Sequence, residues 1–207
     1  AISGATGASY MLGDADVVVA GGMESMSNVP YYLRDARTGY RMGDGKLIDG
    51  MIADGLWDPY GNFHMGEAGE KCSKEYSLSR EAQDEFARES YRRALSAQKE
   101  GLFEAEIAAV EIAQKKGDPL VVDTDEHPRE TSLETLAKLK GVVRPDGTVT
   151  AGNASGVNDG ACALLLADEA TAAKNGLIPK ARVVGMATAG VAPRIMGIGP
   201  APATQKV

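Results

Sequence analysis

The feature that most constrains this chain is a run of small residues, 147–161, that leads directly into an apolar segment. No side chain in the run is larger than valine or asparagine, so a ligand or another backbone can approach it closely. Ser155, Asn153 and Asn158 add groups that can form hydrogen bonds. The apolar residues 162–167 that follow are typical of a strand buried on both faces. The pattern predicts a ligand-binding loop before a central strand, and it is equally compatible with a glycine-rich turn that binds nothing.

A second apolar run predicts another buried strand nearer the start of the chain. Residues 17–20 are continuous and apolar, and they are followed by a Gly-Gly-Met-Glu-Ser-Met-Ser turn over residues 21–27. Residues 1–12 have the pattern of a helix without an N-cap. A helix followed by a buried strand is typical of an α/β protein.

The clearest helix is predicted over residues 79–101. Ser79 can cap its first turn, and Gly101 can adopt the left-handed conformation that ends a helix. Glu81 and Asp84 stand near its start, where the helix dipole favours negative charge. We expect its packed face to be a narrow stripe of small residues, formed by Phe86, Ser90, Ala94 and Ala97.

Further elements follow from local signals. Residues 107–112 and 120–122 are predicted to pair as strands, because turn-forming residues separate them. Asp168 is suited to cap a short helix that ends at Asn175-Gly176. We also expect a strand over residues 181–187 and the beginning of a helix near residues 204–207.

Composition limits the function classes. The formal net charge of -7 argues against nucleic acid as the main partner, because phosphate backbones require concentrated Lys and Arg. No apolar run has transmembrane length and no secretory segment opens the chain, so we expect a cytoplasmic protein with no membrane partner. Cys72 and Cys162 form no disulfide or metal-binding pattern. We expect Cys162 to be an inert thiol inside its buried strand and Cys72 to be structural.

Several segments together resemble the thiolases. The stretch Ala15–Ser27 and the stretch Gly147–Ser155 are similar to two hallmark segments of that family. Other segments match in family order: 41–44, 47–56, 64–66, 79–84 and 196–200. The resemblance therefore covers nearly the whole chain.

The resemblance implies the thiolase-like α/β fold, a layered αβαβα arrangement, with this chain as an incomplete central segment that includes a loop domain. It assigns the end of the N-terminal thiolase half to residues 1–30, the loop domain with its coenzyme A (CoA) elements to 31–150, a return to the N-terminal half to 151–178, and the start of the C-terminal half to 179–207. In thiolases the acyl-accepting cysteine lies shortly before the segment that matches Ala1-Ile2. We therefore expect no catalytic residue in this chain, and no thiolase activity from the chain alone.

The resemblance also implies which residues contact the substrate. His64 and Met65 would line the acyl pocket, Arg129 would lie beside the adenine nucleotide of CoA, and Ser155 would form a hydrogen bond to the pantetheine arm. The complete set of expected CoA-binding residues is Leu56, His64, Met65, Arg129, Ala151, Ala154, Ser155 and Met196. His127 has no such support and is expected to be solvated. No metal and no cofactor is implied beyond CoA thioesters as substrates.

The implied activity is acyl transfer of the acetyl-CoA C-acetyltransferase type, which joins two acetyl-CoA molecules into acetoacetyl-CoA and CoA, or cleaves 3-ketoacyl-CoA in reverse. From Lys115 onward the sequence is more similar to that of 3-oxoadipyl-CoA thiolases, so 3-oxoadipyl-CoA remains an alternative substrate. A non-catalytic CoA-binding protein is a third possibility. The expected partners are acyl-CoA, CoA and further copies of the chain in a dimer or tetramer, because the loop over residues 31–41 resembles a loop that helps thiolase tetramers form.

Overall fold

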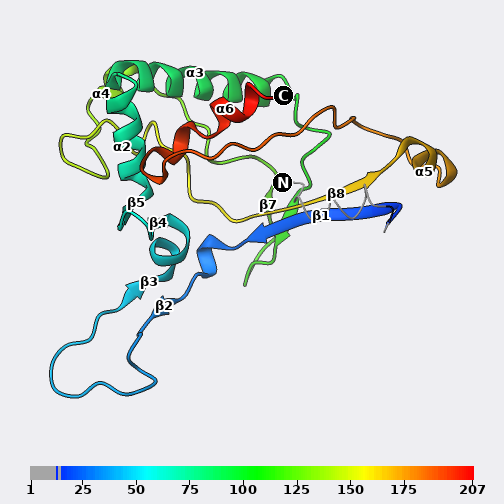
Figure 1. The fold of residues 1–207 in the computed structure, drawn as a ribbon. Helices are drawn as coiled ribbons and strands as arrows, with labels where there is room; N and C mark the ends of the chain where they lie inside the picture. The colour runs from blue at the N-terminus through cyan, green and yellow to red at the C-terminus, as the bar shows by residue number, and fades with distance from the viewer. Residues whose placement is uncertain (1–12, 14) are drawn as a thin grey trace. The chain divides into compact units, whose positions relative to one another are not determined.

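The computed structural model describes residue 13 and residues 15–207, and its contacts divide the chain into two compact units (Figure 1). Unit 1 contains the described part of Ala1–Trp57 together with Val157–Val191 and Ile198–Val207. Unit 2 contains Asp58–Gly156 and Ala192–Gly197. The helix expected over residues 1–12 lies outside the described residues.

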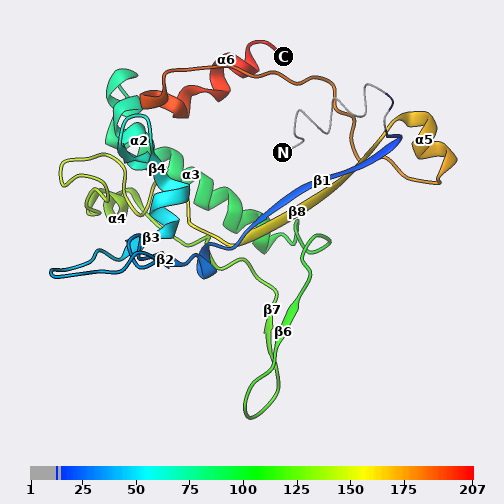
Figure 2. The ribbon, with the colours of Figure 1, turned by 60° about the horizontal axis from the view of Figure 1, so that its bottom comes forward.

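Unit 1 is built on a ribbon of two long antiparallel strands, β1 (Val17–Glu24) and β8 (Gly160–Ala167). The strands pair along their whole length, from Val17 opposite Ala167 to Glu24 opposite Gly160, and they lie side by side in Figures 1 and 2. Both expected strands are therefore confirmed. Strand β1 extends further than the sequence indicated, because the two glycines and Met23 continue it instead of forming the expected turn.

The expectation that these strands are buried on both faces is wrong for the described residues. Val19 is 69% exposed, and most of β8 is exposed as well, including Leu164 and Leu165. Only Ala20 is buried in β1. The physical reason is that, within the part of the chain that the structure describes, the sheet has only these two strands. Cys162 lies in β8 and is exposed, so the expectation that this thiol is buried is also wrong.

The rest of unit 1 consists of short elements. Strand β2 (Tyr31–Tyr32) pairs with β3 (Ile48–Asp49), and the residues between them form the long loop seen beside their labels in Figure 1. A six-residue π-helix, η2 (Met51–Leu56), follows β3. The hydroxyl of Tyr32 donates a hydrogen bond of 2.5 Å to Asp54, and that hydrogen bond raises the pKa of Tyr32. This contact holds β2 to the π-helix.

The C-terminal part of unit 1 agrees only partly with the sequence. Helix α5 (Glu169–Lys174) is confirmed, with Asp168 accepting a hydrogen bond from the backbone N–H of Thr171 and Gly176 in the left-handed region. The strand expected over residues 181–187 is wrong, because that segment has no regular secondary structure and no partner strand among the described residues. The last helix, α6 (Pro200–Thr204), begins earlier than expected and ends where we expected it to start.

Unit 2 is mainly helical. Its helices are α2 (Met65–Glu75), α3 (Arg80–Lys99), the short α4 (Leu133–Ala137) and the 3-10 segment η3 (Pro193–Ile198), which ends one residue beyond the unit. Its strands are β5 (Phe63–His64), β6 (Val110–Ile112), β7 (Leu120–Val122) and β4 (Trp57–Asp58), whose first residue belongs to unit 1. Strands β6 and β7 form the expected hairpin, with Val110 opposite Val122. In Figure 2 the loop of this hairpin extends away from the helices of the unit.

Helix α3 confirms the expected limits but not the expected packed face. The Ser79 hydroxyl accepts a hydrogen bond of 3.1 Å from the backbone N–H of Ala82, and Gly101 has a positive φ. Phe86, however, is 80% exposed and Ser90 is exposed, so only the half-buried Ala94 and Ala97 of the expected stripe are partly covered. The packed face contains Asp84, which is buried in an ion pair with Arg80. This part of α3 packs against the backbone carbonyls of Leu136 and Leu139, which need hydrogen-bond donors, and Arg80 supplies them.

Candidate functional site

Helix α2 lies at the centre of the candidate site, and His64 begins it. The backbone of His64 is extended, with φ -70° and ψ 143°, and its Nδ1 accepts a hydrogen bond of 3.0 Å from the backbone N–H of Gly66. Because Nδ1 is an acceptor, a neutral His64 carries its proton on Nε2. His64 therefore caps the helix and keeps one N–H donor for a ligand, a role that the sequence did not indicate.

Two segments that are distant from α2 in the sequence lie against it, and glycines at the contacts leave room for them. A Cβ on Gly66 would lie 2.3 Å from the Cγ2 of Val143, and one on Gly69 would lie 3.5 Å from the Cγ2 of Val149. Nearer the end of the helix, a Cβ on Gly197 would lie 3.6 Å from the sulfur of Cys72. Helix α2 thus contacts the beginning of the glycine-rich run and the segment that contains Met196.

The glycine-rich run is fixed to α2 by the carboxylate of Glu70. One oxygen accepts from the backbone N–H of Thr148 at 2.9 Å and from its hydroxyl at 3.0 Å, and the other accepts from the backbone N–H of Val149 at 2.9 Å. Arg144 lies 3.7 Å from the same carboxylate, and Glu70 is only 3% exposed. Burial raises the pKa of Glu70, but the three hydrogen bonds and the Arg144 charge outweigh burial, so the pKa is below its ordinary value.

A second anchor holds the same run to α3. Asp84 is 3% exposed and accepts hydrogen bonds from Arg80 at 2.8 Å and from the side-chain amide of Asn153 at 2.9 Å. Arg80 also donates to the backbone carbonyls of Leu136 and Leu139, so one ion pair ties together α3, the end of α4 and the run. Buried charges of this kind need such partners, because an unpaired one is costly.

Between the two anchors the chain makes a compact turn. Thr150 is 0% exposed, its backbone N–H donates to the Asn153 side-chain oxygen at 2.7 Å, and its carbonyl accepts from the backbone N–H groups of Asn153 and Ala154. A Cβ on Gly152 would lie 2.5 Å from a methyl carbon of Leu136, so only glycine fits there without movement. The side-chain oxygen of Asn153 accepts from Thr150, and its side-chain NH₂ donates to Asp84 and to the carbonyl of Thr148. Asn153 therefore has no free group for a ligand, contrary to its expected role.

The expected ligand residues stand next to these anchors. Ala151 and Ser155 are exposed and Ala154 is half-buried, directly beside the anchored turn. The Ser155 hydroxyl forms no hydrogen bond with any described residue, which leaves it open to a ligand. Met65 is half-buried at the start of α2, and Met196 is exposed. The structure therefore gathers six of the expected residues on segments that contact α2 or α3.

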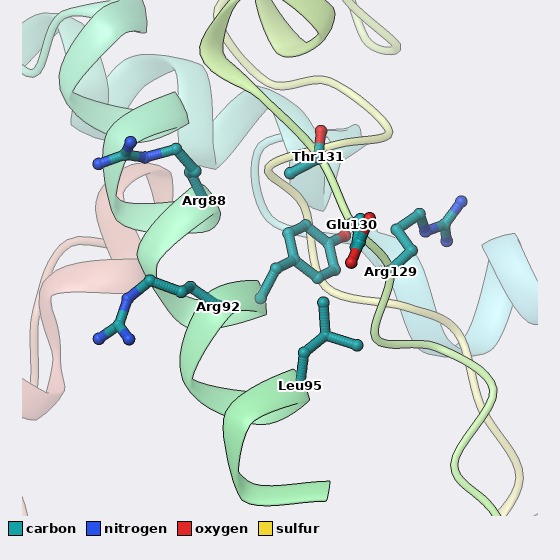
Figure 3. A pocket seen from close by; sticks show the side chains of 7 residues that line it. Arg88, Arg92, Leu95, Arg129, Glu130 and Thr131 are labelled. Atoms are coloured by element: carbon teal, nitrogen blue, oxygen red, sulfur yellow. The ribbon is translucent and has the colours of Figure 1, made fainter. Parts of the chain in front are cut away.

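Arg129 lies at a separate hollow of about 380 Å³ (Figure 3). The hollow is lined by Arg88, Tyr91, Arg92, Leu95, Arg129, Glu130 and Thr131. In the figure the guanidinium groups of Arg88 and Arg92 extend away from Arg129, and Arg88 and Arg92 are paired with Glu85 and Glu89 on the helix surface. His127 is exposed as expected, and it stacks on Tyr91 with ring centroids 6.3 Å apart.

Leu56, the remaining expected ligand residue, ends the π-helix of unit 1 and is half-buried. Sequence reasoning missed the residues that hold the site, namely Glu70, Asp84 and Arg80. The spacing of Arg80 and Asp84, four apart on one helix, was the available signal for an ion pair, whereas nothing local indicated the partner of Glu70.

Two absences apply to the described part of the chain. No group of three or more His, Cys, Asp or Glu residues there is arranged to hold a metal ion. No described helix is both long and apolar enough to cross a membrane.

The sequence and the fold identify the family. Residues 1–170 match the N-terminal domain family of thiolases, and the chain belongs to the thiolase family. The fold is accordingly the thiolase-like α/β fold: a solved structure described as acetyl-CoA acetyltransferase from Syntrophomonas wolfei superposes with a TM-score of 0.90 at 44% identity, covering 97% of this chain and 50% of that one.

Curated relatives give the more specific similarity. The chain is 53% identical to an acetyl-CoA acetyltransferase of Pseudomonas aeruginosa over 195 residues, which are 94% of this chain and 50% of that protein. It is 51% identical to an acetyl-CoA acetyltransferase of Cupriavidus necator over 197 residues, 95% of this chain and 50% of that protein. The chain thus spans about half the length of the curated relatives it matches.

Proposed function

We propose that this chain carries CoA-binding elements of an acetyl-CoA C-acetyltransferase, an enzyme that condenses two acetyl-CoA molecules into acetoacetyl-CoA and CoA. Membership of the thiolase family and the names of the similar proteins support this reaction class. The observation that carries the proposal is the anchored turn, which presents Ala151, Ala154 and Ser155 beside two buried carboxylate anchors. A thin, flexible pantetheine arm requires a surface of this kind.

Each expected residue has a role in binding. The free hydroxyl of Ser155 can exchange a hydrogen bond with a pantetheine amide, and the small side chains of Ala151 and Ala154 leave room for the arm. The Nε2–H of His64 can donate to a thioester carbonyl, while Met65 adds an apolar surface beside it. None of these groups is placed to act as a nucleophile, so this chain contributes binding and orientation.

The remaining contacts involve the ends of CoA. Arg129 lines a hollow whose other walls include the ring of Tyr91 and the side chain of Leu95, surfaces that suit an adenine ring. Its guanidinium can meet a phosphate. Met196 is an exposed apolar side chain that can contact the arm. Leu56 keeps the CoA-binding role that the resemblance to thiolases implies.

The test is an assay with the product of the complete reading frame. We expect CoA-dependent cleavage of acetoacetyl-CoA with a higher kcat/KM than for 3-oxoadipyl-CoA. A higher kcat/KM for 3-oxoadipyl-CoA would favour a 3-oxoadipyl-CoA thiolase instead. Tight CoA binding without cleavage of either substrate would show a non-catalytic CoA-binding protein.

We also propose that the active form is a cytoplasmic homo-oligomer, a dimer or tetramer, that acts in fatty acid metabolism. The exposed apolar side chains of β1 and β8, among them Val19, Met23 and Leu165, support further packing partners. Light scattering on the purified product would give the mass, and a monomer at micromolar concentration would contradict the oligomer.

A further inference from the structure

Glu70 is one of two deeply buried carboxylates that bind the proposed ligand-binding run, and the proposed chemistry does not use it. Its side chain is 3% exposed, and among the described residues its hydrogen bonds do not involve Ala151, Ala154 or Ser155 themselves. Every hydrogen bond that it accepts comes from the two residues that precede the turn, Thr148 and Val149. A carboxylate that accepts only from backbone and hydroxyl donors of one loop is arranged to hold that loop.

Glu70 can approach the run closely because residue 147 is a glycine and has no Cβ. A Cβ on Gly147 would lie 2.3 Å from one Glu70 oxygen, so the glycine lets the carboxylate reach two successive backbone N–H groups. From this fixed point the chain runs through Thr150, fully buried, to Asn153, where Asp84 provides the second anchor. With both ends held, the turn between them has little freedom.

We propose that Glu70 is a positioning residue that sets the place of Ala151, Ala154 and Ser155 before any ligand binds. The inference rests on the proposed function in one respect, that the ligand of the turn is CoA. Preorganisation of this kind lowers the cost of binding, because a flexible glycine-rich loop would otherwise lose conformational freedom when the ligand arrives.

Glu67 provides a matched control on the same helix. It lies one turn before Glu70, it approaches Arg144 at 3.5 Å, and its side chain is 25% exposed. It accepts no hydrogen bond from the run. Glu67→Gln therefore removes a carboxylate of the same helix that also faces Arg144, but leaves the anchor in place.

The experiment compares Glu70→Gln with Glu67→Gln in the product of the complete reading frame. In Glu70→Gln a side-chain NH₂ replaces one acceptor oxygen and faces N–H donors. Without ligand, we expect amide hydrogen exchange at Thr148 and Val149 to accelerate about tenfold or more, as for the loss of a hydrogen bond to a charged group. In thiolysis, we expect the KM for CoA to rise about tenfold while kcat stays within about twofold. Glu67→Gln should change neither quantity more than about twofold.

A milder variant keeps the test valid if Glu70→Gln does not fold. Thr148→Val preserves the shape of the side chain and removes only its hydroxyl hydrogen bond to Glu70. We expect amide hydrogen exchange to accelerate and the KM for CoA to rise, each by about two- to fivefold.

The outcomes separate this inference from the proposed function. Unchanged exchange in Glu70→Gln would overturn the anchor, and faster exchange with unchanged affinity for CoA would overturn the positioning role. If the unaltered protein cleaves no 3-ketoacyl-CoA, the proposed function fails, and affinity for CoA is then measured by calorimetry on the same variants. Equal effects of Glu67→Gln and Glu70→Gln would also contradict the inference.

Discussion

The two parts of the glycine-rich run 147–161 are held by different interactions. Its first part belongs to unit 2, where Glu70 and Asp84 bind the backbone of Thr148 and Val149 and the side chain of Asn153. Its last residues belong to unit 1, where they enter β8 and pair with β1 through backbone hydrogen bonds, and where the Asp159 side chain accepts one hydrogen bond from the backbone N–H of Ser27. Small residues therefore serve two purposes: they let buried carboxylates reach the loop, and they let two strands approach.

The comparison also shows where stability resides. In β1 and β8 the apolar side chains are exposed and bury little surface within the described residues. Around α2 and α3 the carboxylates of Glu70 and Asp84 are buried, and each is paired with several donors. We therefore expect substitutions of the buried carboxylates to have larger effects than substitutions in the ribbon.

The largest expected effect is that of Asp84→Ala. It leaves the half-buried Arg80 charge without its carboxylate and removes one of the hydrogen bonds donated by the Asn153 amide, and breaking a buried ion pair typically costs about 3–5 kcal/mol of unfolding free energy. Urea unfolding of the complete product would measure it. Glu85→Ala, on the same helix but exposed, is the control and should change little. Equal effects of the two variants would remove the contrast between buried anchors and surface pairs.

The second prediction concerns the ribbon. A Cβ on Gly21 would lie 2.4 Å from the backbone carbonyl oxygen of Cys162, whereas nothing lies within 4 Å of one on Gly22. Gly21→Ala should therefore destabilise the protein by about 1–3 kcal/mol, while Gly22→Ala should be neutral or slightly stabilising. Thermal unfolding of both variants would check this. If Gly22→Ala were the more damaging, the described pairing of β1 with β8 would be incorrect.

The third prediction compares an anchored residue with a free one in the same turn. Ser155 forms no hydrogen bond with any described residue, so Ser155→Ala should leave the melting temperature unchanged but weaken CoA-ester binding by about 0.5–1.5 kcal/mol, the loss of one neutral hydrogen bond. The effect should be in KM, because the contact serves ground and transition states alike. Ser155→Val should do more harm, since branching intrudes beside Ala154 and Gly156. Unchanged KM with a thousandfold lower kcat would mean that Ser155 takes part in the chemistry.

The fourth prediction is a pH dependence. The pKa of Glu70 is lowered in the folded protein from its ordinary value of 4.5, so its contribution to stability is present above pH 4.5 and is lost as the pH falls through the folded pKa. Arg144 faces this carboxylate at 3.7 Å and also approaches Glu67 at 3.5 Å. We expect the unfolding free energy to fall below pH 4.5, and Glu70→Gln to flatten that part of the curve. A curve with the same slope in the variant would show that other carboxylates dominate.

The smallest effect is expected for Glu89→Gln. Arg92 and Arg93 lower the pKa of Glu89 to about 2, yet all three side chains lie on the exposed surface of α3, where solvent and salt screen the attraction. We expect no measurable change in melting temperature at physiological salt. A decrease in melting temperature as large as that of Asp84→Ala would mean that burial does not determine how much an ion pair contributes to the stability of this protein.

Much of the local structure could be predicted from the sequence. The Ser79 cap, the Gly101 stop, the β6–β7 hairpin and the Asp168 cap each depend on a few neighbouring residues, and each is confirmed. The small-residue run also gave the correct location for a loop before a strand. The family followed from the order of several such segments.

The failed expectations required knowledge of distant partners. The stripe on α3 and the burial of Cys162 were inferred from residue type alone, and a residue type does not state what packs against it. The strand expected over residues 181–187 failed for the same reason, since a strand needs a neighbour for its hydrogen bonds.

The sequence by itself determined the family, the main helices and strands, and the small side chains that open the proposed CoA path. Only the tertiary structure decided that Glu70 binds Thr148 and Val149, 78 and 79 residues along the chain, and that Asp84 binds Asn153. The physical reason is range: caps and turns are set by hydrogen bonds between near neighbours, whereas a buried carboxylate takes its donors from whichever segment the fold brings beside it.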